Sequence, residues 1–220
     1  MNNSPTLSVK EKEAFAFAID FHVGQKRKLS GYPFIIHLME THKIVTSFSA
    51  SESCRVISIL HDVFEDTAAN ETEIEAKFGI DVLNGIIVLS EGKKVGMTQE
   101  EKRLSWLERK KEHLEKMNNM THESVIIMFS DKLSNMVETI QFCTGIELFN
   151  KTFNASPKET YIYYREVYLK SKNFLLRPLG ISLSRLYSFT KIEENFECYR
   201  NRLKLYKNKF CPEFKEIQTF

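Results

Sequence analysis

The segment from Ile57 to Thr67 limits the possible folds most sharply, because an apolar run leads directly into four ionisable side chains. These are His61, Asp62, Glu65 and Asp66. If the segment is one helix, His61 lies above Glu65 and Asp62 above Asp66, so that all four share one edge. The apolar residues around them predict that this helix is largely buried. Because unpaired buried carboxylates are costly, the segment favours a metal ion, a basic substrate-binding wall, or both.

Helix signals recur along the whole chain. Capping boxes begin at Ser8, Asn70, Thr98 and Ser156, and each marks the start of a helix. The predicted helices run from about residue 8 to 22, 33 to 44, 51 to 67, 70 to 79, 80 to 89, 98 to 117, 122 to 136, 156 to 168 and 186 to 209. The short apolar run at 125–129 also fits a strand, but its continuation at helical spacing favours a helix. The pattern predicts an all-α fold.

Length and composition indicate a single globular unit. The 220 residues are 42% hydrophobic, which is enough for a substantial core. We predict a main domain at 1–170 and a C-terminal helical extension at 171–220 that packs on it. An apolar run long enough to span a membrane is absent from the sequence, and the N-terminus lacks the pattern of a signal peptide, so we expect a cytoplasmic protein with no membrane partner. The four scattered cysteines predict buried free thiols.

The charge is small in sum but clustered. A net charge of +2 argues against a protein that binds nucleic acid through its phosphate backbone. Basic residues concentrate at 26–28, 93–94, 109–111 and 204–209. Each cluster alone fits a solvated face, whereas several of them around an acidic metal centre suit a small polyphosphate substrate.

Two further residues complete a candidate metal-binding set. His37 shares the inward face of its predicted helix with apolar residues, and Asp131 follows an apolar run in a later helix. Together with His61 and Asp62 they make two imidazoles and two carboxylates from three predicted helices. This set suits manganese, iron, magnesium or zinc, with room left for a water molecule.

The sequence motifs around these residues resemble those of one known family. Residues 61–67 read HDVFEDT, which is similar to the HDxxEDT motif of the RelA/SpoT-type alarmone hydrolases within the HD phosphohydrolase superfamily. Three further segments resemble motifs of that family and follow one another in the family's order. They are HVGQKRK at 22–28 with SGYPFIIH at 30–37, WLERK at 106–110, and SDKLSNM at 130–136. The resemblance covers about residues 12–168 and is strongest to the small, stand-alone, hydrolase-only members.

The resemblance implies an HD-domain helical bundle and specific residue roles. His37, His61, Asp62 and Asp131 would hold the metal, expected to be Mn²⁺, while Glu65 and Asp66 would position and deprotonate the attacking water. The implied substrate is a guanine nucleotide, (p)ppGpp, whose 3′-pyrophosphate is hydrolysed to leave GDP or GTP. Arg27 would stack on guanine and Asn135 would contact the ribose; the residues expected to face phosphates are Lys28, Lys93, Arg109, Lys158 and Tyr163.

Several positions differ from the family pattern. Leu38, Phe34, Gly92 and the residues 128–130 replace other types, but each metal ligand and the Glu65–Asp66 pair are present. Because Gly92 and Met128 lie near the expected nucleotide contacts, two alternatives stay open. One is an HD phosphohydrolase for another nucleotide, such as a 3′-phosphorylated dinucleotide or a deoxynucleotide monophosphate; the other is a catalytically silent nucleotide sensor. Whether the chain forms a homodimer is open as well.

Overall fold

Residues 6–91, 97–175 and 183–214 are described by the computed structural model of the protein. Within these ranges all regular structure is helical, apart from an isolated bridge between Lys26 and Pro33. The prediction of an all-α fold is therefore confirmed. The helices are α1 (Val9–Phe21), α2 (Ile35–Ser47), α3 (Glu52–Leu60), α4 (Val63–Asp66), α5 (Glu71–Phe78), α6 (Ile80–Leu89), α7 (Gln99–Leu104), α8 (Trp106–Lys116), the 3₁₀ turn η1 (Met117–Asn119), α9 (His122–Phe142), α10 (Ile146–Thr152), α11 (Pro157–Leu175) and α12 (Leu183–Phe210).

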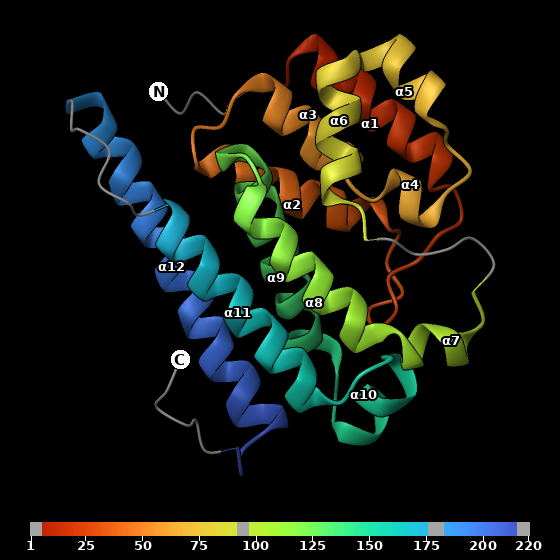
Figure 1. Ribbon diagram of the computed structural model, residues 1–220, viewed down its shortest axis with the longest axis vertical. Coiled ribbons are helices and arrows are strands. Elements are labelled where there is room, and N and C mark those ends of the chain that lie inside the picture. Colours follow the sequence, from red (N-terminus) through yellow and green to blue (C-terminus); the bar gives the residue numbers. More distant parts are fainter. Residues whose placement is uncertain (1–5, 92–96, 176–182, 215–220) are drawn as a thin grey trace.

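Helix α9 is the central element of the bundle. It packs against α2, α3, α6, α11 and α12, and every residue from Ser124 to Ser134 is buried. Figure 1 shows α1, α3, α5 and α6 gathered at one end of the molecule, while α11 and α12 run side by side along α9. Because a helix buried on all sides must satisfy its polar groups internally, the polar side chains of α9 need partners from neighbouring helices.

The segment expected to be one helix from residue 51 to 67 is broken at His61 and Asp62. Helix α3 ends at Leu60 and the short α4 begins at Val63. Asp62, with φ −95° and ψ −1°, is the N-cap of α4 and belongs to neither helix. The prediction of one continuous helix over 51–67 was therefore wrong. The break lets each buried polar group turn toward its own partner, a requirement that hydrophobic periodicity does not report.

A second break and an additional helix also differ from the sequence prediction. The polar helix predicted from 98 to 117 is divided into α7 and α8 at Ser105. The Ser105 hydroxyl donates to the Glu101 carbonyl at 2.7 Å and lies 3.3 Å from Arg109 Nε. A serine that bonds the carbonyl four residues earlier competes with the helical ladder. Helix α10 was not predicted.

The C-terminal helix packs closely on the bundle. Helix α12 contacts α11, α9 and α2, and Tyr199 and Tyr206 in its C-terminal half are fully buried. It starts at Leu183, three residues before the predicted start.

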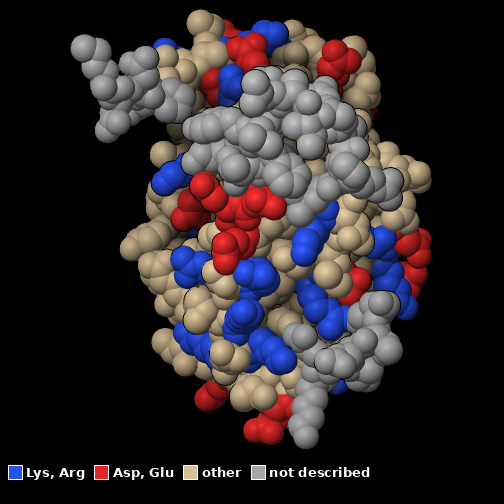
Figure 2. Space-filling model, turned by 90° about the vertical axis from the view of Figure 1, so that its left-hand side faces the viewer, with Lys and Arg blue, Asp and Glu red and all other residues tan. Residues whose placement is uncertain are grey.

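The C-terminal half of α12 is basic on the outside, where Lys204 and Lys209 are exposed, and Figure 2 shows Lys and Arg side chains gathered on this face. The domain boundary at residue 170 stays a prediction; helix α11 is continuous through it.

The other predictions about the chain as a whole had mixed outcomes. Cys54, Cys143 and Cys211 are buried free thiols, as predicted, but Cys198 is exposed on α12. Of the helices that the structure describes, none has the length and apolar character to cross a membrane.

A buried ion cluster joins the first three helices. The Glu11 carboxylate accepts hydrogen bonds from Arg55 Nε at 2.7 Å and from the Ser8 backbone at 2.7 Å, and it lies 2.8 Å from His42 Nε2. Burial alone would raise the pKa of Glu11, but the bonds from Arg55, His42 and Ser8 lower it to about 2. The ionised carboxylate thus ties α1 to α2 and α3.

We expect Glu11→Gln to lower the free energy of unfolding by about 2 kcal/mol at neutral pH. Because the folded-state pKa of Glu11 is lowered, its contribution is complete above pH 4.5 and is lost as the pH falls toward 2. Urea unfolding of both proteins across this range should therefore show the difference shrinking on acidification. Glu13→Gln, an exposed change on the same helix, is the control. A difference that stays constant with pH would contradict this role for Glu11.

Candidate metal centre and its cavity

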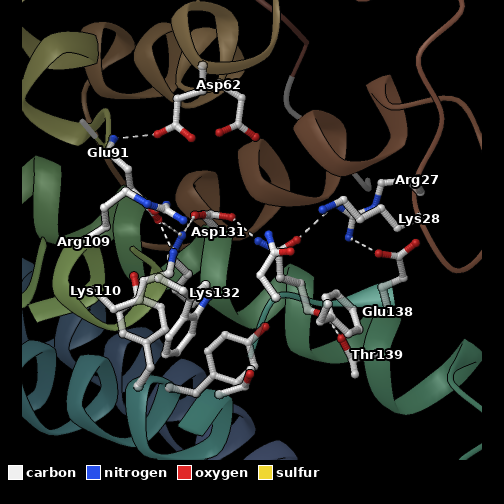
Figure 3. A pocket seen from close by; sticks show the side chains of 18 of the residues that line it. Arg27, Lys28, Asp62, Glu91, Arg109, Lys110, Asp131, Lys132, Glu138 and Thr139 are labelled. Atoms are coloured by element: carbon white, nitrogen blue, oxygen red, sulfur yellow. Dashed lines mark hydrogen bonds and ion pairs between the residues drawn. The ribbon is translucent and has the colours of Figure 1, made fainter. Parts of the chain in front are cut away.

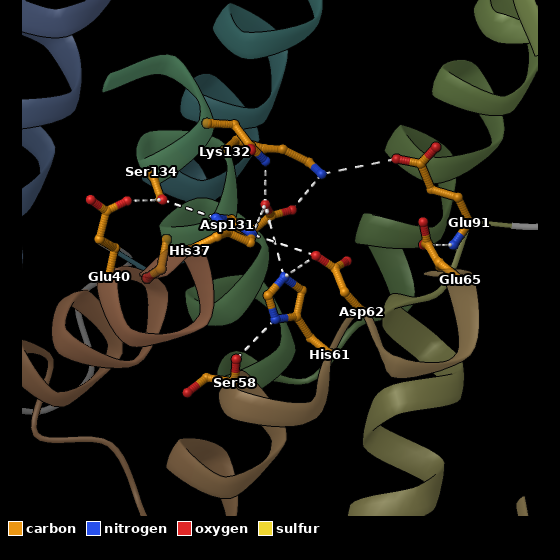
Figure 4. A network of polar contacts seen from close by, with 12 residues as sticks. His37, Glu40, Ser58, His61, Asp62, Glu65, Glu91, Asp131, Lys132 and Ser134 are labelled. Carbon is orange, nitrogen blue, oxygen red and sulfur yellow. Dashed lines mark hydrogen bonds and ion pairs between the residues drawn. The ribbon is translucent and has the colours of Figure 1, made fainter. Parts of the chain in front are cut away.

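The four predicted metal ligands lie together between α2, α9 and the break before α4. His37 Nε2 lies 3.5 Å from Asp62 Oδ2 and 3.3 Å from Asp131 Oδ1; His61 Nε2 lies 3.3 Å and 3.9 Å from the same two atoms. Ligand atoms of His37, His61 and Asp62 all fall within 4.8 Å of one another. Figure 4 shows the four side chains converging from these separate elements.

Hydrogen bonds on the far side of each ring fix how the histidines face the cluster. Ser134 Oγ donates to Glu40 at 2.7 Å, so it accepts from His37 Nδ1 at 3.0 Å. The Nδ1 atom of His61 donates to the Ser58 carbonyl at 2.8 Å. With Nδ1 protonated in both rings, each Nε2 presents a lone pair to the cluster, the arrangement that metal-binding histidines adopt.

The cluster is therefore made of electron-rich atoms that face one another. Nε2 of His61 is buried without a hydrogen bond in the described part of the chain. Burial lowers the pKa of His37, but interactions with Asp131 and Asp62 raise it above its ordinary value. Burial raises the pKa of Asp62, but the charge of His61 and contact with His37 lower it below the usual range. All these effects favour positive charge at the centre, and the nitrogen and oxygen donors fit a divalent cation.

The two predicted water-activating residues lie on α4. The Glu65 carboxylate accepts a hydrogen bond from the Glu91 backbone N–H at 2.6 Å, and it lines the same cavity as Asp62 and Asp131. Asp66 is the last residue of α4, and its side chain lies outside what the structure describes. Glu65 is thus held at the edge of the cluster by a main-chain bond.

A cavity of about 460 Å³ opens beside the cluster. This volume is in the range of small-ligand sites. Asp131 lies between two groups of charged side chains, as Figure 3 shows: Arg27, Lys28 and Glu138 on one side, and Arg109, Lys110 and Glu91 on the other. The cavity therefore joins acidic residues at the metal centre to cations on both sides.

At one end of the cavity, an ion pair holds Arg27. Its guanidinium lies 2.6 Å from Glu138 Oε2 and donates to Asn135 Oδ1 at 3.0 Å. Glu138 also accepts from the Ser30 hydroxyl at 2.9 Å, which ties the loop before α2 to α9. Asn135 donates in turn to Asp131, so the predicted nucleoside contacts are connected to the metal centre.

At the other end, Arg109 and Lys110 meet the carboxylate of Glu91. Arg109 donates to Glu91 Oε2 at 3.0 Å and to the Lys102 carbonyl at 3.0 Å. Lys110 donates to Glu91 Oε1, and Lys132 pairs with Asp131 at 2.5 Å. Burial raises the pKa of Glu91, but Lys110, His113 and Lys132 hold it well below the usual range.

Of the other residues predicted to contact phosphates, some line the cavity and others do not. Lys28 and Tyr163 line the cavity, and the Tyr163 hydroxyl lies 3.0 Å from His113 Nδ1. Lys158 is not among the cavity residues; its ammonium lies 5.0 Å from the centre of the Phe214 ring instead. Lys93 falls outside the described residues.

Sequence reasoning missed several polar residues of the site. Ser134 and Glu138 were missed, although they share one face of the buried helix α9 with the predicted Asp131 and Asn135, at the spacing i, i+3, i+4, i+7. This polar stripe on an otherwise apolar helix was the signal that could have found them. Glu91 stands after the end of α6 and carries no such pattern.

Comparison with known proteins gives relatives along part of the chain. A GTP pyrophosphokinase of Myxococcus xanthus is 36% identical over 95 residues, covering 41% of this chain and 12% of that protein. A probable guanosine-3′,5′-bis(diphosphate) 3′-pyrophosphohydrolase of Mycoplasma pneumoniae is 28% identical over 147 residues, covering 63% of this chain and 19% of that protein. The chain thus spans less than a fifth of the length of these curated relatives.

Solved structures match more of the chain. A metazoan ortholog of SpoT, described as hydrolysing ppGpp, superposes with a TM-score of 0.60 at 23% identity over 86% of this chain and 95% of that one. The protein lmo0812 of Listeria monocytogenes gives a TM-score of 0.60 at 22% identity over 82% of this chain and 99% of that one. These likenesses show a shared fold. The family profile described as HD domain matches residues 14–142, and the chain therefore belongs to the HD-domain family.

Proposed function

We propose that this protein is a metal-dependent hydrolase that removes the 3′-pyrophosphate of (p)ppGpp, leaving GDP or GTP. The observation that carries the proposal is the juxtaposition of the His37, His61, Asp62 and Asp131 cluster with Glu65 and a cation-lined cavity. The names of the matching relatives, which include a probable guanosine-3′,5′-bis(diphosphate) 3′-pyrophosphohydrolase, support the same substrate. Cytoplasmic location and a homodimer stay predictions.

The metal-binding part of the proposal assigns four ligands. His37 and His61 would each give Nε2, and Asp62 and Asp131 would each give a carboxylate oxygen, to an ion that we propose to be Mn²⁺. A divalent ion held by these residues would lower the pKa of a bound water and offset negative charge on a phosphoryl group. Ser134 and Ser58 keep the two rings in the required tautomer.

The other residues would bind, orient and transfer a proton. Glu65 takes a proton from the attacking water, and Asp66 is proposed to assist it. The water oxygen would join the phosphorus next to the ribose as the bond from that phosphorus to the ribose 3′ oxygen breaks. The 3′ oxygen would take up a proton and stay on the nucleoside as a hydroxyl, and pyrophosphate would be released. Arg109 and Lys28 would face the phosphates, with Tyr163 beside them, and Lys93 is a further candidate.

The nucleoside would occupy the Arg27 end of the cavity. A planar guanidinium stacks on a base better than an ammonium does, and Glu138 holds that of Arg27 in place. Asn135, which lies between Arg27 and Asp131, is proposed to contact the ribose. With the base at the Arg27 end, the 3′-phosphates would lie toward Asp131, which Asn135 contacts directly.

A panel of nucleotides tests the assignment. We expect Mn²⁺-dependent release of pyrophosphate from ppGpp and pppGpp, measured by anion exchange, with much slower turnover of 3′-phosphorylated dinucleotides and deoxynucleotide monophosphates. Orthophosphate release from one of these other nucleotides would keep the metal centre and overturn the substrate. Tight nucleotide binding with turnover of none of them would favour a sensor instead.

A further inference from the structure

Glu91 has no part in the reaction as proposed, yet it is among the most enclosed charges of the protein. Its side chain is 5% exposed. The carboxylate pairs with Arg109 at 3.0 Å and with Lys110, and lies 3.6 Å from His113 Nδ1 and 3.9 Å from Lys132 Nζ. One buried carboxylate thus faces three basic side chains, two of which come from consecutive positions on α8.

The main chain of the same residue reaches the catalytic segment. The Glu91 N–H donates to Glu65 Oε1 at 2.6 Å, and Figure 4 shows this bond together with the line of charges from Glu91 through Lys132 to Asp131. Glu91 therefore connects the cation end of the cavity to the metal centre without lying in the cluster itself.

Lys110 is the cation that depends most on Glu91. It lines the cavity, and its ammonium lies 4.8 Å from the Tyr163 ring and 5.8 Å from the Trp106 ring. Burial and the charge of Lys132 lower the pKa of Lys110, while the charge of Glu91 and, more weakly, that of Glu65 raise it. The net result is a pKa below the ordinary value of a lysine. Arg109 and His113 complete the charged and titratable groups around Glu91. Without Glu91, Lys110 would face mainly aromatic rings and other cations.

We propose that Lys110 is a second phosphate-binding cation beside Arg109, and that Glu91 is the positioning residue that keeps Lys110 protonated and directed at the cavity. The identity of the substrate rests on the proposed function, but the inference itself applies to any polyphosphate that enters this end. Arg109 stays charged at every pH of interest, so the contribution of Glu91 appears through Lys110.

Glu91→Gln separates this role from a structural one. The glutamine keeps the size of the side chain and the main-chain bond to Glu65, and removes only the charge. The probe is inorganic pyrophosphate in metal-free buffer, with binding measured by calorimetry from about pH 6 to about pH 9. At the acidic end the variant should bind at least as tightly as wild type, because Lys110 is protonated in both proteins. At the alkaline end it should bind about tenfold or more weakly, because Lys110 has lost its proton.

Two controls accompany this measurement. Glu108→Gln removes an exposed carboxylate from α8, the helix that carries Lys110, and its pyrophosphate affinity should follow the wild-type curve. Adding Lys110→Arg to Glu91→Gln should restore alkaline binding, because a guanidinium keeps its proton in this range. Wild-type and Glu91→Gln curves that run parallel at all pH values would overturn the inference, since misfolding or repacking lowers affinity by one factor throughout.

A second variant keeps the inference testable if Glu91→Gln does not fold. Lys110→Met should lower pyrophosphate affinity about tenfold without the burial of an unpaired carboxylate, because Arg109 still pairs with Glu91; unchanged affinity would overturn the assignment of Lys110. Turnover of ppGpp by wild type is measured in parallel. If wild type does not turn over ppGpp but Glu91→Gln loses pyrophosphate affinity at alkaline pH, only the proposed function is refuted. If wild type turns over ppGpp but the two binding curves run parallel, only this inference is refuted.

Discussion

Asp62→Asn is expected to lower kcat/KM for ppGpp by at least about 10³-fold. The change preserves the size of the side chain but replaces an anionic donor by an amide, whose NH₂ group would face the lone pairs of His37 and His61 at 3.5 Å and 3.3 Å. Titration with Mn²⁺ should show a matching loss of metal affinity. Both measurements are needed, because the loss of metal is the reason for the loss of turnover.

Asp20→Asn serves as the control for this variant, because Asp20 is an exposed aspartate on α1. It should keep wild-type turnover and Mn²⁺ affinity. An Asp62→Asn protein that binds Mn²⁺ and turns over ppGpp like wild type would remove Asp62 from the metal centre.

Glu65→Gln is expected to lower kcat about 10²- to 10⁴-fold with little change in KM. Glutamine can still accept the Glu91 N–H through its amide oxygen, so the side chain keeps its place while it loses the ability to take a proton from water. Steady-state kinetics on ppGpp would separate the two constants. Mn²⁺ affinity should be unchanged, in contrast to Asp62→Asn.

The matched control is Glu75→Gln, an exposed change on α5 that should leave both constants unaltered. Should Glu65→Gln raise KM and spare kcat, Glu65 would be a binding residue, and the proton acceptor would have to be sought elsewhere on α4.

Much of the fold was readable from local signals. The capping boxes at Ser8 and Asn70 mark the starts of α1 and α5, and Gly79, with φ +93°, separates α5 from α6 as expected. These features depend on a few neighbouring residues, so a sequence pattern reports them well. The all-α class follows from their number and spacing.

The break at His61 and Asp62 could not be read in the same way. Hydrophobic spacing across 57–67 is that of one helix, but the actual path depends on partners far along the chain. Asp62 turns toward His37, and Glu65 toward the Glu91 N–H. Which of these contacts prevails is decided by the satisfaction of buried polar groups in the folded protein, and no local signal carries that information.

The site shows the same division between what motifs carry and what tertiary contacts add. The motifs predicted a cluster of His37, His61, Asp62 and Asp131, and these four side chains lie together. Glu91 was not found, because it stands alone after α6 and its partners Arg109 and Lys110 belong to α8. Lys158, which the family resemblance implied would face a phosphate, has its ammonium beside the Phe214 ring instead.

The most direct test of the account is hydrolysis of ppGpp with Mn²⁺ in isotopically labelled water, followed by mass spectrometry of the products. Attack of water on the phosphorus next to the ribose predicts one labelled oxygen in pyrophosphate and none in GDP, with no product from Asp62→Asn. Label in GDP, release of orthophosphate in place of pyrophosphate, or turnover that persists in Asp62→Asn would contradict the proposed reaction at this metal centre.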